Sequence, residues 1–307
     1  MSNTAYHIPV LLKETVDGLA IRPDGTYVDV TFGGGGHSAE ILSRLGANGK
    51  LFGFDQDEDA HKNTLKDERF TLIPANFRYL KRFLRFNGIK QVDGILGDFG
   101  VSSHQFNEAE RGFSTRFEAK LDMRMNQQDS LSAYQVVNQY EEEDLARIFR
   151  TYGEFRMAYK LAKAIVSHRS NTPITTTQEL NEVVSVYFPP TKVNKMLAML
   201  YQAIRIEVNQ EIQALKEFLL QTAEVVKPGG RISLISYHSL EDRLVKRYIR
   251  SGKFEGEAEK DFFGRIHVPF KKVGGLVVPS DEEIQENSRA RSAKLRIAER
   301  LIDEERN

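Results

Sequence analysis

The sequence predicts an α/β protein with a mostly parallel, Rossmann-like sheet and an inserted helical domain. Between residues 27 and 98, short apolar segments rich in β-branched and aromatic residues alternate with segments of helical periodicity. Such alternation is typical of parallel strands joined by crossover helices. After Asp98 it stops, helical periodicity continues to about residue 193, and a strand-like segment returns at residues 231–237. We therefore expect residues 1–103 and 194–307 to form the sheet domain and residues 104–193 to form the helical insertion.

The first strand, at residues 27–30, leads into four consecutive glycines, Gly33 to Gly36, and then into a helical segment at residues 39–45. Each glycine in an ordered segment costs about 0.5–1 kcal/mol relative to alanine. Four in succession indicate that the backbone bends sharply or lies against a bulky ligand. A flexible linker is the less consistent interpretation, because linkers seldom lie between a buried strand and an amphipathic helix. We expect this turn to bind a ligand.

The next elements follow in chain order. Further strands are expected at residues 50–54, 70–74 and 92–98, the first of them ending at Asp55 and the last at Asp98. A helix at residues 77–85 has apolar residues at helical spacing and basic residues on its other side. This leaves two interpretations open, a solvated surface or a contact with nucleic acid. In the insertion, Thr176 and Glu179 form a capping-box pattern that starts a helix.

The sheet domain is expected to resume with one long amphipathic helix, whose apolar residues recur at helical spacing from Leu197 to Leu219. The segment at residues 227–230 ends this helix. The strand at residues 231–237 then delivers His238 to the carboxyl edge of the sheet, where open α/β sheets keep their sites. Two weaker strands are expected near residues 264–271 and 293–297, with a polar helix start after Pro279 between them.

The composition excludes several classes of protein. The chain has 307 residues, of which 40% are hydrophobic, and it contains no cysteine, so disulfides and thiolate chemistry are excluded. No apolar run approaches the roughly 20 residues of a membrane helix, and the N-terminus lacks a secretory pattern, so we expect a cytoplasmic protein with no membrane partner. The 43 basic and 43 acidic residues give zero formal net charge, so any contact with nucleic acid must be local. The seven histidines show no ligand spacing, and no metal site is expected.

Acidic residues at the strand ends indicate the ligand of the glycine turn. Asp55 lies 20 residues after Gly35, the spacing at which a carboxylate meets the ribose of an adenosine-containing ligand. A nicotinamide dinucleotide is the first alternative, but Ser38 stands where its fingerprint has a third glycine. A Walker-type site would need a Gly-Lys-Ser/Thr sequence, which is missing. No basic residue in the turn offsets a pyrophosphate, and an acidic rim suits a cationic sulfonium. S-adenosylmethionine fits best beside the four strand-end aspartates, Asp29, Asp55, Asp57 and Asp98.

The first motif, Asp29-x-Thr31-x-Gly33-x-Gly35, is similar to that of class I S-adenosylmethionine-dependent methyltransferases. From about Tyr6 to about Arg300, the chain resembles, in order, the bacterial family of 16S rRNA cytosine-N4 methyltransferases known as RsmH or MraW. The motifs that carry this resemblance are His7-x-Pro9-Val10-Leu11-Leu12-x-Glu14, Thr31-Phe32-Gly33-x-Gly35-Gly36-His37-Ser38, Asp98-Phe99-Gly100-Val101-Ser102-Ser103-x-Gln105, Arg111-Gly112-Phe113-Ser114, Leu121-Asp122-Met123-Arg124-Met125, Gln202-Ala203-Ile204-Arg205-Ile206-x-Val208-Asn209-x-Glu211, His238-Ser239-Leu240-Glu241-Asp242-Arg243 and Arg289-x-Arg291-Ser292-Ala293-Lys294-Leu295-Arg296.

The resemblance implies a class I fold whose helical insertion recognises the substrate. It also implies methylation of the exocyclic N4 amine of a cytidine in the decoding region of 16S rRNA, with the small ribosomal subunit as partner, and it leaves a homodimer open. The chain departs from the family at Tyr237, where phenylalanine is usual, at Thr115 and at Ser288. The residues implied to bind the cofactor are Gly35, Gly36 and His37 in the turn, Asp55 at the ribose, Phe77 near the adenine, and Asp98 and Gln105 after the fourth strand.

Catalysis requires a group that accepts a hydrogen bond from the target amine. The amine of cytosine is a poor nucleophile, because its lone pair is delocalised into the ring, so it must be held in line with the methyl carbon; positioning alone can supply roughly 7–11 kcal/mol. Many amino methyltransferases use an Asp/Asn/Ser-Pro-Pro-aromatic sequence after the fourth strand, which this chain lacks. Asp98 occupies that place, so we expect Asp98 to be catalytic, with His238 as the second candidate. Two simpler roles stay open, cofactor binding alone for Asp98 and a structural hydrogen bond for His238.

Contacts with RNA are the least specific part of the prediction. Asp122 and Arg124 are expected to pair with each other and orient the insertion, and the target base is expected to be unstacked from its helix. Two other functions remain alternatives: methylation of DNA or of another RNA, and a non-catalytic, S-adenosylmethionine-sensing RNA-binding module. The candidates for phosphate contact, each of which could also belong to a solvated surface, are Arg243, Lys246, Arg247, Arg250, Arg289, Arg291, Lys294 and Arg296.

Overall fold

The chain forms two compact units. The computed structural model describes residues 9–256, 258, 260, 262, 264 and 267–302, so the start of the motif at His7 lies outside the described residues. Unit 1 comprises residues 1–100 and 212–307, and unit 2 comprises residues 101–211. The helix at residues 193–209, which the sequence led us to expect in the sheet domain, therefore belongs to unit 2.

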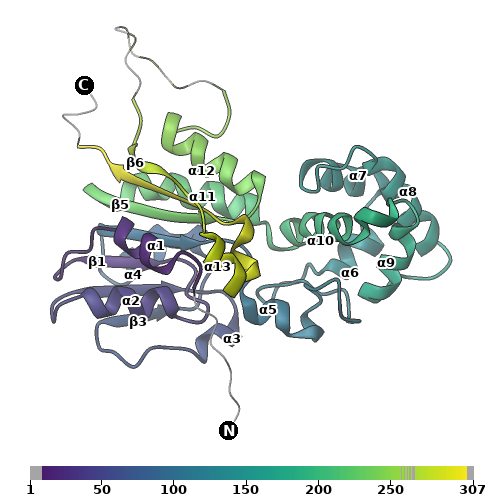
Figure 1. The fold of residues 1–307 in the computed structure, drawn as a ribbon, viewed down its shortest axis with the longest axis horizontal. Helices are drawn as coiled ribbons and strands as arrows, with labels where there is room; N and C mark the ends of the chain where they lie inside the picture. Colours follow the sequence, from purple (N-terminus) through teal and green to yellow (C-terminus); the bar gives the residue numbers. More distant parts are fainter. Residues whose placement is uncertain are drawn as a thin grey trace. The chain divides into compact units, whose positions relative to one another are not determined.

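Unit 1 contains a seven-stranded sheet with the order β3-β2-β1-β4-β5-β7-β6 (Figure 1). The first five of these strands are parallel, and β7 runs antiparallel to both β5 and β6. This confirms the predicted α/β class. The strand order reverses between β1 and β4, and ligands of open α/β sheets bind at the carboxyl ends beside such a reversal. The strands are β1 (Thr26–Asp29), β2 (Lys50–Phe54), β3 (Phe70–Ile73), β4 (Val92–Asp98), β5 (Val226–Ser236), β6 (Phe270–Val277) and β7 (Lys294–Arg300).

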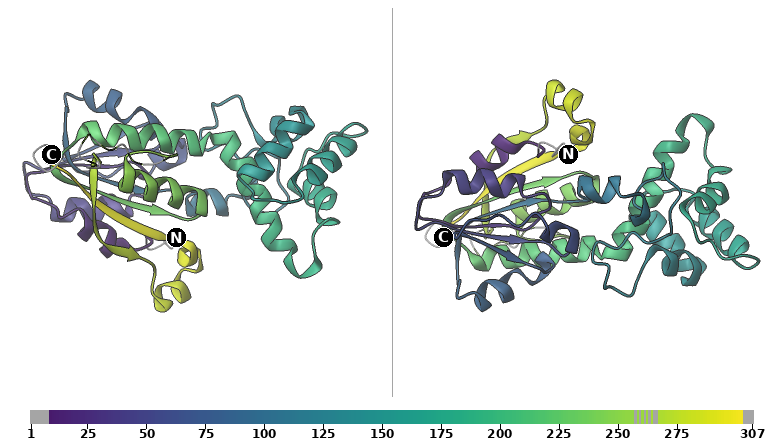
Figure 2. Two further views of the ribbon diagram at one scale, coloured as in Figure 1. Left: turned by 90° about the horizontal axis from the view of Figure 1, so that it is seen from above. Right: turned by 90° about the horizontal axis from the view of Figure 1, so that it is seen from below.

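Helices cover both faces of this sheet (Figure 2). Because side chains alternate along a strand, Tyr27 and Val28 point to opposite faces. Tyr27 packs in a cluster with α1 (Leu12–Gly18) and α2 (Gly36–Arg44), whereas Val28 packs with side chains of the helices on the other face. This double cover explains why the strands are continuous apolar runs. The helices on the second face are α4 (Leu80–Phe86), α11 (Glu211–Val225) and α12 (Ser239–Ser251), and shorter helices are α3 (Glu58–His61), α13 (Asp281–Glu286), η1 (Phe77–Tyr79) and η4 (Ser288–Ser292).

The C-terminal strands differ in extent from the prediction. Strand β5 begins at Val226, so residues 227–230, which were expected to end a helix, lie within the strand. The pairing with β4 shifts between Val92 and Gly94, which accommodates a proline and two glycines as an irregular segment. Lys227 anchors this segment, since its Nζ lies 2.7 Å from a carboxylate oxygen of Asp93. Strand β6 begins only at Phe270, and part of the strand expected near residues 264–271 lies outside the described residues.

Unit 2 is helical, and a single apolar core holds it together. The core includes Phe149, Leu161 and Leu180, all fully buried. The capping box of Thr176 and Glu179 is confirmed at the start of α9. Across the described part of the whole chain, no helix is both long and apolar enough to span a membrane. The helices of unit 2 are α5 (Ser103–Asn107), η2 (Ala109–Arg111), α6 (Ala133–Gln139), α7 (Glu142–Thr151), α8 (Ala158–Arg169), α9 (Thr177–Ser185), η3 (Pro190–Lys192) and α10 (Val193–Asn209).

The long amphipathic helix expected from residue 194 onward is in fact two helices, α10 and α11. They are separated at Gln210, whose φ of 51° lies in the left-handed region that ends an α-helix. The preceding side chain, Asn209, ties the end of α10 to a distant loop. Its Oδ1 accepts a hydrogen bond from the Met125 N–H (2.7 Å), and its Nδ2 donates to the Met123 carbonyl (2.8 Å). In the same loop, Arg124 and Asp122 form the expected ion pair, with N–O distances of 2.7 and 2.8 Å.

Replacing Asn209 with leucine is expected to lower the free energy of unfolding by about 2 kcal/mol, because the Met125 N–H and the Met123 carbonyl would lose their partners, and a buried unpaired polar group costs about 1–3 kcal/mol. Urea denaturation measures the change. The matched control is Asn194→Ala, an exposed residue of the same helix. Equal destabilisation by the two substitutions would contradict the proposed role of Asn209.

Candidate active site

The end of β1 is tied to the start of α2 by a buried carboxylate. Asp29 accepts hydrogen bonds from the Ser38 hydroxyl (2.7 Å) and from the Thr31 N–H (3.1 Å). Burial raises the pKa of the Asp29 carboxyl, although both hydrogen bonds act against this shift. Asp29 therefore fixes the two ends of the glycine turn relative to each other.

The glycines between these ends are required by the backbone and by close packing. Gly35 has a φ of 78°, in the left-handed region that favours glycine. A Cβ atom on Gly36 would lie 2.2 Å from Cγ of Pro9, so no side chain fits there. The turn is also held from outside, because Asn63 Nδ2 donates to the Gly33 carbonyl at 3.0 Å. The result is an ordered turn that presents backbone rather than side chains.

Asp55 follows β2 and receives this turn. One carboxylate oxygen accepts the Gly33 N–H (2.8 Å) and the other accepts the Asp57 N–H (2.9 Å). Burial raises the pKa of the Asp55 carboxyl to about 6, and the nearby carboxylates of Asp57 and Asp29 add to the shift. The side chain is only partly buried, and a carboxylate has about four acceptor positions. Asp55 can therefore still accept hydrogen bonds from two adjacent hydroxyls, as a ribose would offer.

Asp98 lies at the end of β4, beside the reversal in strand order. Its N–H donates to the Thr31 hydroxyl at 2.6 Å, and its Oδ1 accepts the hydroxyl of Tyr237 at 2.7 Å. Burial raises the pKa of the Asp98 carboxyl to about 6, while His37 and Tyr237 oppose the shift. Oδ2 is 3.9 Å from His37 Nδ1, beyond hydrogen-bonding distance, so this oxygen keeps acceptor capacity.

His37 is the second residue of α2 and the only titratable residue within the glycine turn motif at residues 31–38. Its Nε2 lies 3.1 Å from the carbonyl of Val10, and because a carbonyl only accepts, this nitrogen carries the proton. Burial lowers the pKa of His37, despite the opposing effect of Asp98. Burial therefore favours the neutral ring, and Nδ1 lies 3.9 Å from a carboxylate oxygen of Asp98.

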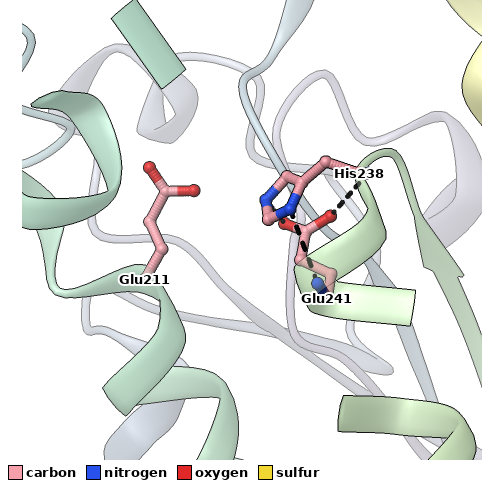
Figure 3. A group of neighbouring side chains, drawn as sticks. All are labelled: Glu211, His238 and Glu241. Carbon is pink, nitrogen blue, oxygen red and sulfur yellow. Dashed lines mark hydrogen bonds and ion pairs between the residues drawn. The ribbon is translucent and has the colours of Figure 1, made fainter. Parts of the chain in front are cut away.

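His238 caps helix α12 (Figure 3). Its Nδ1 lies 3.5 Å from the Glu241 N–H, and a Glu241 carboxylate oxygen accepts the N–H groups of Tyr237 (3.0 Å) and His238 (3.4 Å). The imidazole Nε2 is 3.1 Å from the other carboxylate oxygen of Glu241 but is not hydrogen-bonded to it, so the contacts at the helix start are the ones that hold the residue. These contacts give His238 a definite structural role. Its role in catalysis stays a prediction.

The other two predicted cofactor residues lie in different units. Phe77 of unit 1 is partly buried and packs against Phe99 and Phe218, with ring centroids 5.8 and 5.4 Å apart. It therefore lies next to the residue that follows Asp98. Gln105 belongs to unit 2, where it forms a capping box with Ser102 at the start of α5.

The model of the MraW methylase family matches residues 4–301. The chain belongs to this family. Proteins named ribosomal RNA small subunit methyltransferase H are similar to this methylase over nearly their whole lengths. The protein of Christiangramia forsetii is 71% identical over 96% of this chain and 98% of its own. The protein of Flavobacterium johnsoniae is 68% identical over 96% of this chain and 98% of its own. The protein of Bacteroides thetaiotaomicron is 57% identical over 96% of this chain and 97% of its own.

S-adenosylmethionine is the methyl donor of this methylase family, as the sequence predicted. The site described above fits the donor on its own geometry. The glycine turn is ordered and presents backbone, and Asp55 can accept ribose hydroxyls. Burial is the main cause of the raised pKa values of Asp55 and Asp98, and the nearby carboxylate of Asp29 adds to both, so a cationic sulfonium beside these acids would be stabilised.

Two residues of the methylase's site were not identified from the sequence. Tyr237 was noted only as a departure from the family, yet its hydroxyl binds Asp98. Asn63 lies outside every motif and binds the carbonyl of Gly33. The position of Tyr237 at a strand end was a usable signal, whereas nothing in the sequence marks Asn63.

The basic residues predicted to contact phosphate differ in availability. Arg296 Nε lies 2.7 Å from the carboxylate of Asp242, and Lys294 Nζ is 3.7 Å from the same group. These two cations are therefore already neutralised in part. Lys246 and Arg250 lie exposed on α12 and Arg291 lies exposed in η4, so these three remain candidates for contact with phosphate.

Proposed function

We propose that this methylase transfers a methyl group from S-adenosylmethionine to the exocyclic N4 amine of a cytidine in the decoding region of 16S rRNA. The names of its relatives support rRNA of the small ribosomal subunit as the substrate. The methylation of an amine is inferred from the position of Asp98, whose carboxylate lies at the end of β4 beside the glycine turn. One oxygen of this carboxylate accepts the hydroxyl of Tyr237, and the other accepts no hydrogen bond from the described residues of unit 1.

The chemistry follows from what Asp98 can do at that position. The donor supplies a methyl group on a positively charged sulfur, which is a good leaving group without protonation. Asp98 accepts an N–H of the target amine through Oδ2, which aligns the nitrogen and stabilises the positive charge that forms on it. Tyr237 donates to Oδ1, so the carboxylate is held in one orientation. The proton leaves the product amine after transfer, and the carboxylate that accepts its hydrogen bond can receive it.

The first test is transfer of labelled methyl from S-adenosylmethionine to small ribosomal subunits that lack base methylation. The rRNA is then digested to nucleosides and separated. Label in N4-methylcytidine is the expected result. Label in another nucleoside would still show an rRNA methyltransferase, but it would overturn the assignment of the N4 amine of cytidine as the target.

The same assay separates the alternatives. A DNA substrate in place of the ribosomal subunit tests the second enzymatic function, and label in DNA with none in rRNA would favour it. Binding of S-adenosylmethionine without transfer to any substrate from several assembly stages would favour the non-catalytic RNA-binding module.

The acidic site predicts a steep dependence on pH. Asp55 and Asp98 each have a pKa of about 6 in the free protein, and each acts in its ionised form. Protonation below pH 6 therefore weakens donor binding and removes the acceptor, so kcat/KM for S-adenosylmethionine should fall by up to about 100-fold per pH unit, tenfold for each group. Initial rates between pH 5 and 8 measure this. The variant Asp55→Asn should show a tenfold slope, and an unchanged slope would contradict the assignment of Asp55.

A further inference from the structure

Unit 2 carries an exposed surface on which aromatic and basic side chains alternate. We call it the aromatic-basic patch and define it as Arg150 at the end of α7, Tyr159, Lys160 and Lys163 on α8, and Tyr187 after α9. Helix α8 packs against both α7 and α9 (Figure 1), so the patch takes its residues from neighbouring segments.

Two cation–π contacts connect the patch. The guanidinium carbon of Arg150 lies 5.1 Å from the ring centroid of Tyr159, and Lys160 Nζ lies 4.9 Å from that of Tyr187. Tyr159 and Lys160 are successive residues of α8, so one pair joins α8 to α7 and the other joins α8 to the segment after α9. Lys163 follows Tyr159 by four residues and therefore lies on the same side of α8. Tyr159 is 51% exposed, so its ring keeps free surface beside the guanidinium.

The segment that carries most of the patch is basic and contains no acidic residue. No acidic residue occurs between Phe155 and Gln178, and within the described residues Arg150, Lys160 and Lys163 form no ion pair. The next acids along the chain are engaged elsewhere: Glu179 in its capping box and Glu182 with Gln178. Arg147 provides the contrast, because on the same helix as Arg150 it pairs with both Asp144 and Glu207. Glu154, in the loop after α7, is the acidic residue closest to Arg150 in sequence, and no ion pair joins the two within the described residues.

Single-stranded RNA has the chemistry that this surface matches. Its phosphates require cations, and its unstacked bases require aromatic faces, which is the combination that RNA-binding proteins use for loops and ends. We propose that the aromatic-basic patch binds unpaired nucleotides of the rRNA substrate, with a base stacked on Tyr159 and the flanking phosphates near Lys160, Lys163 and Arg150. This rests on the proposed function, since it assigns a substrate contact to unit 2. The alternative is a solvated surface that binds no partner. In that case the affinity for RNA would not change when the ring of Tyr159 is removed.

The test measures the affinity of the full-length protein for unmethylated 16S rRNA over a series of salt concentrations. Tyr159→Ala is expected to raise Kd roughly tenfold, whereas Tyr159→Phe, which keeps the ring, should bind nearly as the wild type does. The double substitution Lys160→Gln and Lys163→Gln should lower the slope of log Kd against log salt by about 1.4, or about 0.7 for each phosphate that is no longer neutralised. All the substituted side chains are exposed, so thermal unfolding should stay near that of the wild type.

Matched controls come from unit 1. Leu220 is 52% exposed and Lys66 is exposed, so Leu220→Ala and Lys66→Gln remove an apolar and a cationic side chain at another surface. Their RNA affinity should be unchanged. In the methyl transfer assay, Tyr159→Ala should raise KM for the rRNA substrate and leave KM for S-adenosylmethionine unaltered, which separates substrate binding from a general structural defect.

The proposal would be overturned if all patch variants bound RNA with wild-type affinity, or if the control variants lost as much affinity as the patch variants. It would also be overturned if the patch variants lost affinity for assembled small subunits and none for free rRNA. That result would assign the patch to a contact with a ribosomal protein. Failure of the proposed function is distinguishable. If the wild type forms no N4-methylcytidine and Tyr159→Ala still weakens RNA binding, the proposal that the patch binds RNA is supported and the proposed N4 methylation is wrong.

Discussion

Replacing Asp98 with asparagine is expected to lower kcat about 1,000-fold at saturating S-adenosylmethionine and rRNA. The two side chains have nearly the same shape, so the end of β4 keeps its packing, and Tyr237 can still donate to Oδ1. The other atom changes from an oxygen that accepts to an NH₂ group that donates, so the target amine loses its acceptor. A side chain that acts as general acid or base at a reacting centre typically raises the rate 10²–10⁴-fold. Single-turnover transfer measures the effect without interference from product release.

Two comparisons show what a loss in Asp98→Asn means. Tyr237→Phe keeps the carboxylate and removes one hydrogen bond, so its kcat should fall less than tenfold. An Asp98→Asn variant with wild-type kcat and a raised KM for the donor would assign Asp98 to cofactor binding alone. Loss of folding is not expected. Because the pKa of Asp98 is raised on folding, its ionised form lowers stability above about pH 6, and the neutral amide removes this penalty at neutral pH.

Asp55→Ala is expected to raise the Kd for S-adenosylmethionine about 100-fold, with kcat at saturation changed by less than threefold. The variant loses the acceptor of the ribose hydroxyls and leaves the Gly33 N–H without its partner. A hydrogen bond to a charged group contributes about 1.5–3 kcal/mol, and 100-fold corresponds to about 2.7 kcal/mol. Isothermal titration calorimetry measures the change.

S-adenosylhomocysteine and a second variant complete the experiment on Asp55. The two ligands share the ribose, so the affinity for both should fall by the same factor in Asp55→Ala. Glu68→Ala removes an exposed carboxylate of unit 1 and should leave both affinities unaltered. Wild-type affinity in Asp55→Ala would show that the ribose is bound by another group.

The strands near the site could be predicted from the sequence with little error. The expected bounds of β2 and β4, residues 50–54 and 92–98, are those observed, because an aspartate marks the end of each apolar run. The same rule brought Asp55 and Asp98 to the carboxyl edge of the sheet. Alternation and strand ends are local properties of the chain, and local properties can be recognised in a single sequence.

Features that depend on distant partners could not be predicted. The bond between Tyr237 and Asp98 joins residues far apart in the chain, and it depends on the register of β4 with β5. The break at Gln210 was missed because one left-handed residue hardly alters the spacing of the apolar side chains around it. The early start of β5 was missed because Pro228 and its glycines suggest a turn, whereas a shift in strand pairing accommodates them.

The crowded carboxylates also affect how the spent cofactor leaves. The Asp29 carboxylate adds to the raised pKa values of both Asp55 and Asp98, so in the free protein Asp29 repels these two acids. The donor brings a positive charge that relieves this repulsion. Methyl transfer removes that charge from sulfur, and the neutral thioether no longer offsets the three acids. The site is therefore expected to hold its product less tightly than its substrate, so the electrostatics that favour binding before the reaction favour exchange of the cofactor after it.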